Sequence, residues 1–481
     1  MHRRWPALLA LTAALGVAHL GFAAGASAQI SLHDALSAAD DAAFPNRIAA
    51  GNLAARRGES LAPLRGMLPT LRLDAGYLRT TDPLNTFGLA LQQRGITAAD
   101  FDPQRLNFPG AIGNYSAGIV VEQPLFNADA WLGRRAASHA VDATTAQQSW
   151  TRISTHTDVI RAYYGAVLAA ERVATLEAAA RAAHSHVTQA QSMVRNGLVT
   201  KSDALLAEVR AGEVDAQLVE ARGNAESAGR QLEVALGQDP AGDLALPRSL
   251  PASARIVDVV AADTAARPQA SRADIEAARR GLDAARADAL RARSTYLPRV
   301  NGFARYDWNS ASRPYAGDRS WTVGVMASWD LFAGASTLSD VRATAGREST
   351  ARAQADAASA KARLEAQQSR TALEVALARL AIAERAVAQS TEAHRIVAKQ
   401  YEGGLATIAA LLDAQAADVS SSLALSQARY AAIVAGAERK QTLGLDPASI
   451  AALDDFPTGT ASSDPTANER DGRPGHDAPP R

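Results

Sequence analysis

The feature that most constrains the fold of this chain is an internal duplication. Residues 197–200 (Gly-Leu-Val-Thr) recur as residues 404–407 (Gly-Leu-Ala-Thr), at a shift of 207 residues (404 − 197). The same shift takes the Leu-Gly pair at 236–237 onto the Leu-Gly pair at 443–444. A chain that repeats a unit in this way is expected to fold as two similar structural units.

The two copies are not equally long. The Leu-Pro pair at 68–69 matches the one at 297–298 at a shift of 229, whereas the Leu-Phe pair at 125–126 matches the one at 331–332 at a shift of 206. The first copy therefore carries 23 additional residues (229 − 206), which lie within 80–114. We divide the chain into a first repeat over 29–240 and a second over 241–455.

Each copy is predicted to contain a helix, two strands and two further helices. The first helices are expected over 32–64 and 256–293, and Pro69 and Pro298 come after them, because the residue before a proline disfavours the helical conformation. Apolar and polar residues then alternate, which indicates strands with one apolar face. The strands are predicted over 71–77, 116–121, 300–308 and 321–329.

Very long helices are predicted after the strands. Residues 130–194 and 335–400 are rich in Ala, with Leu, Glu, Arg and Gln at helical spacing. A helix of about 65 residues extends about 100 Å. Gly197 and Gly404 end these runs, and a return helix is expected after each. With only 5% aromatic residues, the chain favours long, closely packed helices over a compact aromatic core.

The N-terminus predicts export. Arg3 and Arg4 precede an apolar run over 8–22, and small residues at 26–28 follow it, which is the pattern of a cleaved signal peptide over 1–28. The chain contains no cysteine, which excludes a lipidated cysteine anchor, disulfides and thiolate ligands. Its 50 basic residues balance 50 acidic ones, so no net charge favours binding to nucleic acid.

Four strands per chain do not close a membrane barrel. Such barrels need about eight strands or more, and unpaired strand edges cannot face lipid. If these strands cross a membrane, the chain must belong to an oligomer, of two copies for eight strands or of three for twelve. The alternative is a soluble antiparallel sheet that caps a helical bundle.

No pattern typical of an active site is found. The histidines in the helical segments lack the spacing of a zinc protease, and neither a Gly-x-Ser-x-Gly elbow nor a glycine-rich phosphate loop occurs. We therefore predict no catalytic, cofactor-binding or metal-binding residues and no enzyme activity. The terminal stretch over 456–481, rich in Pro, Gly, Ser and Asp, is expected to be disordered.

Four segments carry a resemblance to a known family. They are residues 194–206 and 401–415 around the two helix breaks, and residues 123–126 and 329–332 at the ends of strands. In this order and in duplicate, they resemble the TolC family of outer membrane efflux proteins. The resemblance implies a mixed membrane protein, a homotrimer in which a 12-stranded β-barrel with four strands per chain is continuous with a long α-helical periplasmic barrel.

The resemblance also implies a function. The chain would be a passive exit duct in outer membrane lipid, through which a periplasmic adaptor protein and an inner membrane transporter export small molecules. The loops over 78–114 and 309–318 would face the outside of the cell. Two alternatives remain open: the exit duct of a one-step protein secretion system, and a coiled-coil scaffold or adhesin that forms no channel.

By the same resemblance, the two helix breaks would be hairpin tips that dock the adaptor. The residues implied in docking are Arg195, Asn196, Gly197, Leu198 and Thr200 in the first copy, and Gly403, Gly404, Leu405 and Thr407 in the second.

A periplasmic gate is implied at the same tips. Members of the family have a tyrosine before the second hairpin glycine and two aspartates after it. Tyr401 and Asp413 match, whereas Ala410 replaces the first aspartate and Ala406 replaces an arginine found in some members. Three copies of Asp413 would form an acidic ring, the alternative being a solvated helix residue. Asp203 is a further gate candidate, the alternative being a helix cap.

Overall fold

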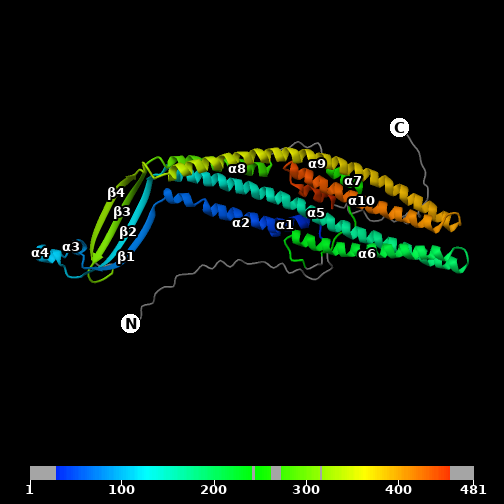
Figure 1. The fold of residues 1–481 in the computed structure, drawn as a ribbon, viewed down its shortest axis with the longest axis horizontal. Helices are drawn as coiled ribbons and strands as arrows, with labels where there is room; N and C mark the ends of the chain where they lie inside the picture. The colour runs from blue at the N-terminus through cyan, green and yellow to red at the C-terminus, as the bar shows by residue number, and fades with distance from the viewer. Residues whose placement is uncertain (1–28, 241–243, 262–271, 315–316, 455–481) are drawn as a thin grey trace, which may run out of the picture.

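The molecule is long and narrow, and its two ends differ (Figure 1). The computed structural model describes residues 29–240, 244–261, 272–314 and 317–454. A sheet forms one end, two helical hairpins reach the other, and a belt of shorter elements packs around the middle of the long helices (Figure 1). The predicted signal peptide (1–28) and C-terminal tail (456–481) lie outside the described residues.

The first helix of each copy is interrupted. The helix predicted over 32–64 is instead α1 (Leu32–Ala42), α2 (Phe44–Glu59) and the short 3₁₀ helix η1 (Ala62–Gly66). The break falls at Ala43, whose backbone is extended, with φ −57° and ψ 132°. Pro45 lies in the first turn of α2, where its missing N–H is tolerated, whereas a proline inside one continuous helix would remove a hydrogen bond.

The corresponding prediction for the second copy, one helix over 256–293, also needs correction. The described residues there form α7 (Ser253–Ala261) and α8 (Ala273–Ser294), and residues 262–271 lie outside the described part of the chain. Arg272 precedes α8 with an extended backbone, φ −52° and ψ 138°, so α8 begins as a new helix.

The four predicted strands exist and are longer than predicted. They are β1 (Thr70–Thr80), β2 (Ile112–Phe126), β3 (Arg299–Ser310) and β4 (Asp318–Ser328), in one antiparallel sheet of order β1-β2-β3-β4. Backbone pairing extends past the alternating residues, so sequence alternation alone underestimates the strands. Trp329 lies just beyond β4, and its indole N–H donates to the carbonyl of Tyr296 at 2.9 Å.

The strands assemble one continuous apolar face. The register pairs Leu71 with Val121, Tyr306 with Trp321, and Ile119 with Tyr306, so apolar side chains of adjacent strands share a face. The opposite face carries the polar residues of the alternation, including Arg72, Asp74, Glu122, Asn301, Arg305, Asp307 and Thr322.

The additional residues of the first copy fold at the outer end of this sheet. Between β1 and β2 lie α3 (Pro83–Gln92), the 3₁₀ helix η2 (Ala98–Phe101) and α4 (Pro103–Asn107), which project past the sheet away from the long helices (Figure 1). We call residues 81–111 the outer insert. The second copy connects β3 to β4 through residues 311–317 only.

Two long helical hairpins are the largest units of the fold. The first consists of α5 (Ala128–Arg195) and α6 (Lys201–Ala235), and the second of α9 (Ser336–Glu402) and α10 (Ile408–Thr442). At 68 and 67 residues, α5 and α9 each extend about 100 Å, as predicted. Many buried positions of α5 and α6 are alanines, which let helix backbones approach closely.

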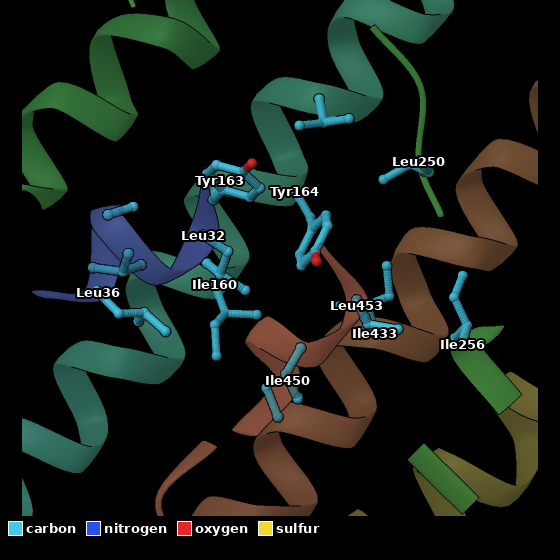
Figure 2. Packing of buried hydrophobic residues seen from close by; sticks show 14 of the residues in the cluster. Leu32, Leu36, Ile160, Tyr163, Tyr164, Leu250, Ile256, Ile433, Ile450 and Leu453 are labelled. Carbon is cyan, nitrogen blue, oxygen red and sulfur yellow. The ribbon is translucent and has the colours of Figure 1, made fainter. Parts of the chain in front are cut away.

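The largest apolar core lies in the belt. Leu32 and Leu36 of α1, Ile160 of α5, Ile433 of α10 and Ile450 of the 3₁₀ helix η3 (Pro447–Leu453) pack together (Figure 2).

Asp454 joins the two ends of the described chain to this belt. Its carboxylate accepts hydrogen bonds from Tyr164 Oη (3.0 Å), Tyr163 Oη (3.2 Å) and the backbone N–H of Leu32 (2.6 Å). Burial, followed by the charge of Asp454, raises the pKa of both tyrosines, so both remain neutral donors. Copy 1 and copy 2 are thereby held together at mid-length.

Candidate functional site

The two hairpin tips have nearly the same backbone. Gly197 and Gly404 have φ of +72° and +73°, a conformation that favours glycine, and each follows the last turn of a long helix. Leu198 N–H donates to the carbonyl of Met193 at 2.9 Å, and Leu405 N–H donates to that of Gln400 at 2.7 Å. The repeated sequence therefore gives the same Schellman-type turn twice.

The first tip is closed by a reciprocal cap. Thr200 Oγ1 accepts from the backbone N–H of Asp203 at 3.3 Å, and the Asp203 carboxylate accepts from the Thr200 N–H at 3.0 Å and from its hydroxyl at 2.8 Å. This is a capping box at the start of α6. The alternative role of Asp203, capping the return helix, is therefore the one its contacts support.

The second tip has only half of this cap. Thr407 Oγ1 accepts from the Ala410 N–H at 3.2 Å, and the backbone angles of Thr407 match those of Thr200 to within 1°. Ala410 is the counterpart of Asp203 (203 + 207 = 410) and has no carboxylate to return the hydrogen bond. The residue at which the family pattern has an aspartate is thus also the residue that would complete the cap.

Tyr401 lies between the hairpins. It is 4% exposed and comes from α9, and it packs in an apolar cluster with residues of the other three long helices: Ala190, Ala204, Ala207, Ile408, Leu411 and Leu412. Its hydroxyl donates to Met193 Sδ at 3.3 Å. Burial, and then the charge of Asp203, raises the pKa of Tyr401. In this protomer the side chain joins one hairpin to the other.

Asp413 lies on the surface of α10. Its side chain is 74% exposed, and one carboxylate oxygen is 3.9 Å from Nη2 of Arg210 on α6. Arg210 is held more closely by Glu213, at 2.9 Å. Asp203 and Asp413 thus have different partners, Thr200 and Arg210, and most of the Asp413 side chain is exposed.

The leucines of the two tips are strongly exposed. Leu198 is 68% exposed and Leu405 is 85% exposed, at equivalent places in the two turns. The remaining predicted docking residues are structural parts of the same turns. Asn196 and Gly403 are C-caps, Thr200 and Thr407 are N-caps, and Arg195 ends α5.

A buried ionic network in the belt was not predicted from the sequence. His156 of α5 is 2% exposed; its Nδ1 lies 2.7 Å from Asp446 and its Nε2 2.9 Å from Asp40. Arg152 binds the same Asp40 through two hydrogen bonds of 2.7 and 2.6 Å. The partners are 116 and 290 residues away in sequence, so no local pattern identifies them.

The electrostatics of this network favour a protonated histidine. Burial by itself would lower the pKa of His156, but hydrogen bonds and charge from Asp446 and Asp40 outweigh it and raise the pKa. Burial likewise opposes ionisation of Asp40 and Asp446. Hydrogen bonds from Arg152 and His156 nevertheless lower the pKa of Asp40, and hydrogen bonds from His156 and the Ala448 N–H lower the pKa of Asp446. The network is thus a tie between α1, α5 and the segment after α10.

In the described ranges, no group of three or more His, Cys, Asp or Glu side chains is arranged to hold a metal ion.

Comparison with known proteins agrees with this architecture. Residues 47–238 and 267–444 match the model of a family described as outer membrane efflux protein. The two matched segments correspond to the two repeats.

Solved structures of outer membrane proteins share the fold. VceC of Vibrio cholerae is 20% identical, with 86% of this chain and 96% of that chain covered at a TM-score of 0.70. The Campylobacter jejuni CmeC outer membrane channel is 14% identical, with 86% of this chain and 85% of that chain covered at a TM-score of 0.71. The open state of the Neisseria gonorrhoeae MtrE outer membrane channel is 18% identical, with 87% of this chain and 90% of that chain covered at a TM-score of 0.68.

One curated relative is named for secretion rather than efflux. Alkaline protease secretion protein AprF of Pseudomonas aeruginosa is 27% identical over 246 residues, which is 48% of this chain and 48% of that protein. The match therefore spans about half the length of this relative.

Proposed function

Because this chain belongs to the outer membrane efflux protein family, we propose that it is one subunit of a homotrimeric channel, the passive exit duct of a tripartite system that exports small molecules. The predicted family and fold class are confirmed, as is the location in the outer membrane with a periplasmic extension. The division into repeats over 29–240 and 241–455, the trimer, the partners and the exported substrates are parts of the proposal.

The observation that carries the proposal is the four-stranded sheet. Its apolar face is unusually exposed in the protomer: Leu71 is 75% exposed, Trp321 72% and Val325 68%. Such a face must be covered, and lipid covers it if the strands cross a membrane. The strands have 11 to 15 residues, enough for a tilted transmembrane strand, which needs about 9 to 11.

The sheet edges support more than one copy. β1 and β4 each have a partner strand on one side only. Because four strands alternate in direction, β4 of one copy would meet β1 of the next as an antiparallel pair, and the same interface would repeat until the barrel closes. Three copies give twelve strands, in keeping with the family pattern.

The long helices supply the second part of the duct. Hairpins that extend about 100 Å beyond the sheet would reach deep into the periplasm. The exposed Leu198 and Leu405 at their tips are the candidate contacts for a periplasmic adaptor, which would connect the duct to an inner membrane transporter. The duct itself would select little, so specificity would reside in that transporter.

The channel proposal is tested by conductance. Purified full-length protein in planar bilayers should give discrete conductance steps and migrate as a trimer after chemical crosslinking. If the protein remains monomeric after crosslinking and gives no conductance, the proposal is contradicted and a scaffold or adhesin is favoured.

Adjacent substitutions test which face of the sheet meets lipid. Val323→Lys places a charge on the apolar face, where lysine near the bilayer midplane costs about 2 to 4 kcal/mol, and should lower the amount of assembled trimer in the membrane. Thr322→Lys is the matched control on the polar face and should leave assembly intact. Equal effects of the two changes would contradict the assignment of the faces.

A second candidate is the exit duct of a protein secretion system. It is favoured by the match to AprF, which is described as an alkaline protease secretion protein. Deleting the gene should sensitise cells to small toxic compounds if the duct serves efflux, and should abolish export of a secreted protein in the other case. The assay must use cells that carry the cognate transporter and adaptor.

A further inference from the structure

The outer insert contacts the sheet through two consecutive residues at the end of α3. Gln93 Nε2 donates to Asn114 Oδ1 at 2.8 Å and to the carbonyl of Gly113 at 2.9 Å. Arg94 donates from Nη2 to the carbonyl of Arg319 at 3.3 Å, and its Nε lies 3.6 Å from a carboxylate oxygen of Asp318. The insert leaves from β1 and so reaches across to the far edge strand β4.

The side chains that receive these contacts form a row on the polar face of the sheet. Asn309 is paired with Ser116 on one side and with Asp318 on the other, and Asn114 shares the face of Ser116 because it lies two residues away. Asn114 Nδ2 donates to Asn309 Oδ1 at 2.8 Å. This face is opposite to the apolar one, so it lines the interior of the proposed barrel.

The two asparagines of the row are buried although they lie at the outer end of the sheet, whereas the Asp318 side chain is 42% exposed. Asn114 is 3% exposed and Asn309 is 8% exposed. Polar side chains at the rim of an aqueous channel would otherwise be hydrated. Their burial shows that other parts of the protomer, among them Gln93, cover the interior side of the rim.

Arg94 has a backbone conformation that is costly for its residue type. It is the one described residue other than glycine with a positive φ, at +51°, and it lies where the helix C-terminal turn normally has glycine. Gly95 follows immediately, and its N–H donates to the Ala90 carbonyl at 2.9 Å to complete the turn. An arginine at such a position indicates that its side chain is needed, here for the contact with β4.

We propose that the outer insert is a size-limiting constriction of the duct, held over the interior of the barrel mouth by the contacts of Gln93 and Arg94. The inference rests on the proposed trimeric channel. The three inserts meet at one mouth, and their exposed Leu84 and Phe108, 82% and 81% exposed in the protomer, supply apolar surface for contacts between copies. The insert thereby determines which molecules enter from outside.

The dimensions are compatible with this role. Twelve strands about 4.8 Å apart, tilted by about 40°, enclose a ring with a backbone diameter of about 24 Å. A helix with its side chains is about 11 Å thick, and three such helices side by side fill a circle of about 24 Å. One short helix from each copy is therefore enough to obstruct most of the opening.

The test uses the absence of native cysteine. Thr322→Cys places a single thiol on the polar face of β4, four residues from Asp318, which is about 13 Å along the strand. Intact cells are treated from outside with maleimides attached to polyethylene glycol of increasing size. Unlike conductance, this readout does not depend on whether the periplasmic gate is open.

Two variants are made in the Thr322→Cys background. Arg94→Gly removes the contact to β4 and suits the positive φ, so it tests the side chain rather than the turn. Replacing residues 84–110 with a short Gly-Ser turn removes the obstruction. Arg313→Gly, at an exposed arginine of the β3–β4 connection, is the matched control.

In the parent, small maleimides should react and large ones should not. The size limit should shift upward in Arg94→Gly, shift further in the shortened insert, and stay unchanged in Arg313→Gly. The inference is overturned if large reagents label the parent, or if the size limit is the same with and without the insert. Failure of the channel proposal differs from both, because purified parent protein would then give no conductance.

Discussion

The two copies of the repeat share a backbone but are fastened differently. At the tips, the turns around Gly197 and Gly404 have the same pattern of backbone hydrogen bonds. The cap of the first turn is completed by Asp203, whereas the second has Ala410 at that position and lacks the carboxylate. In the belt, the first long helix is tied by His156, whereas the corresponding place in the second, at a shift of 206 or 207, holds Ala362 or Arg363. The reciprocal cap and the histidine tie are therefore features of the first copy, whereas α9 of the second is tied by Glu365, which lies 2.8 Å from the buried Arg272.

One contact between the hairpins comes from the second copy alone. Tyr401 of the second copy corresponds to Val194 of the first (401 − 207 = 194), and it is the tyrosine that bridges to Met193 of the first hairpin. The tip with the incomplete cap is thus also held by its neighbour. A duct that opens by moving one hairpin against the other would be expected to move the second one, with Tyr401 as the contact that must be released.

The largest effect is predicted for Tyr401→Ala. Removing a buried aromatic ring costs about 3 kcal/mol or more, and here the loss falls on the packing between the tips. Hydrogen exchange should accelerate around residues 187–207 and 397–412 and remain unchanged in the belt. Leu405→Ala, at a side chain that is 85% exposed, is the control and should leave exchange in both regions unaltered. Equal exchange in both variants would show that the tips do not hold each other.

The second prediction concerns the tie that the first copy has in the belt. His156→Gln removes a buried imidazolium between two carboxylates and should destabilise the protein by about 2 kcal/mol near pH 6. A thermal shift assay on the purified trimer should show a lower midpoint. Arg363→Gln, at an exposed position of α9, is the control and should change the midpoint little.

The pH dependence of this effect has a definite sign. The pKa of His156 is raised above its ordinary value of 6.5, so its stabilisation is complete below about pH 6.5 and is lost as the pH rises through the raised pKa. The pKa values of Asp40 and Asp446 are lowered from 3.8, so their contribution is lost only at more acidic pH. The difference in thermal midpoint between wild type and His156→Gln should become smaller from pH 6 to pH 9. A difference that becomes larger over this range would contradict the ionic tie.

A smaller effect is predicted from exchanging the caps. Asp203→Ala should cost the first tip about 1 kcal/mol, because it removes one half of the capping box. Ala410→Asp should stabilise the second tip by a similar amount and make the two turns equivalent. Local hydrogen exchange at the starts of α6 and α10 measures both. If Ala410→Asp gives no protection, the asymmetry of the tips does not arise from the missing carboxylate.

The smallest effect on stability is expected for Asp413→Ala. The side chain is 74% exposed and its pairing with Arg210 at 3.9 Å is long, so the stability should change by less than about 0.5 kcal/mol. If three copies form an acidic ring, the variant should lose cation selectivity and gain conductance, most clearly at low salt. Asp356→Ala, an exposed acid in mid-α9, is the control. Unchanged selectivity would remove Asp413 from the gate.

Much of the fold could be predicted because it depends on periodic patterns of neighbouring residues. The four strands, the two long helices and both hairpin turns follow from alternation, helical spacing and glycine at 197 and 404. The errors lie where a local signal is weak or misread. Pro45 divides the first helix at a point that the apolar pattern does not mark, and the strands continue through Gly113 and Asn114 because a neighbouring strand pairs with them.

The candidate site was only partly predictable for a different reason. The leucines at the tips come directly from the repeated motif, and Tyr401 comes from the resemblance to the family. The contacts of His156 with residues 116 and 290 positions away, and of Arg94 with β4 more than 200 positions away, depend on which helices and strands become neighbours. Side chains of the same type elsewhere in the chain give the same local signal without these contacts.

By itself, the sequence determined a duplicated chain with four strands, two long hairpins and strands too few to close a barrel alone. These properties depend on residues within one turn or one strand of each other. Only the tertiary structure decided where each copy is tied, that Asp203 completes a cap, that Tyr401 joins the hairpins, and that the outer insert contacts the polar face of the sheet through Gln93 and Arg94. Those outcomes depend on distant groups that become neighbours after folding, where burial and charge give each contact its strength.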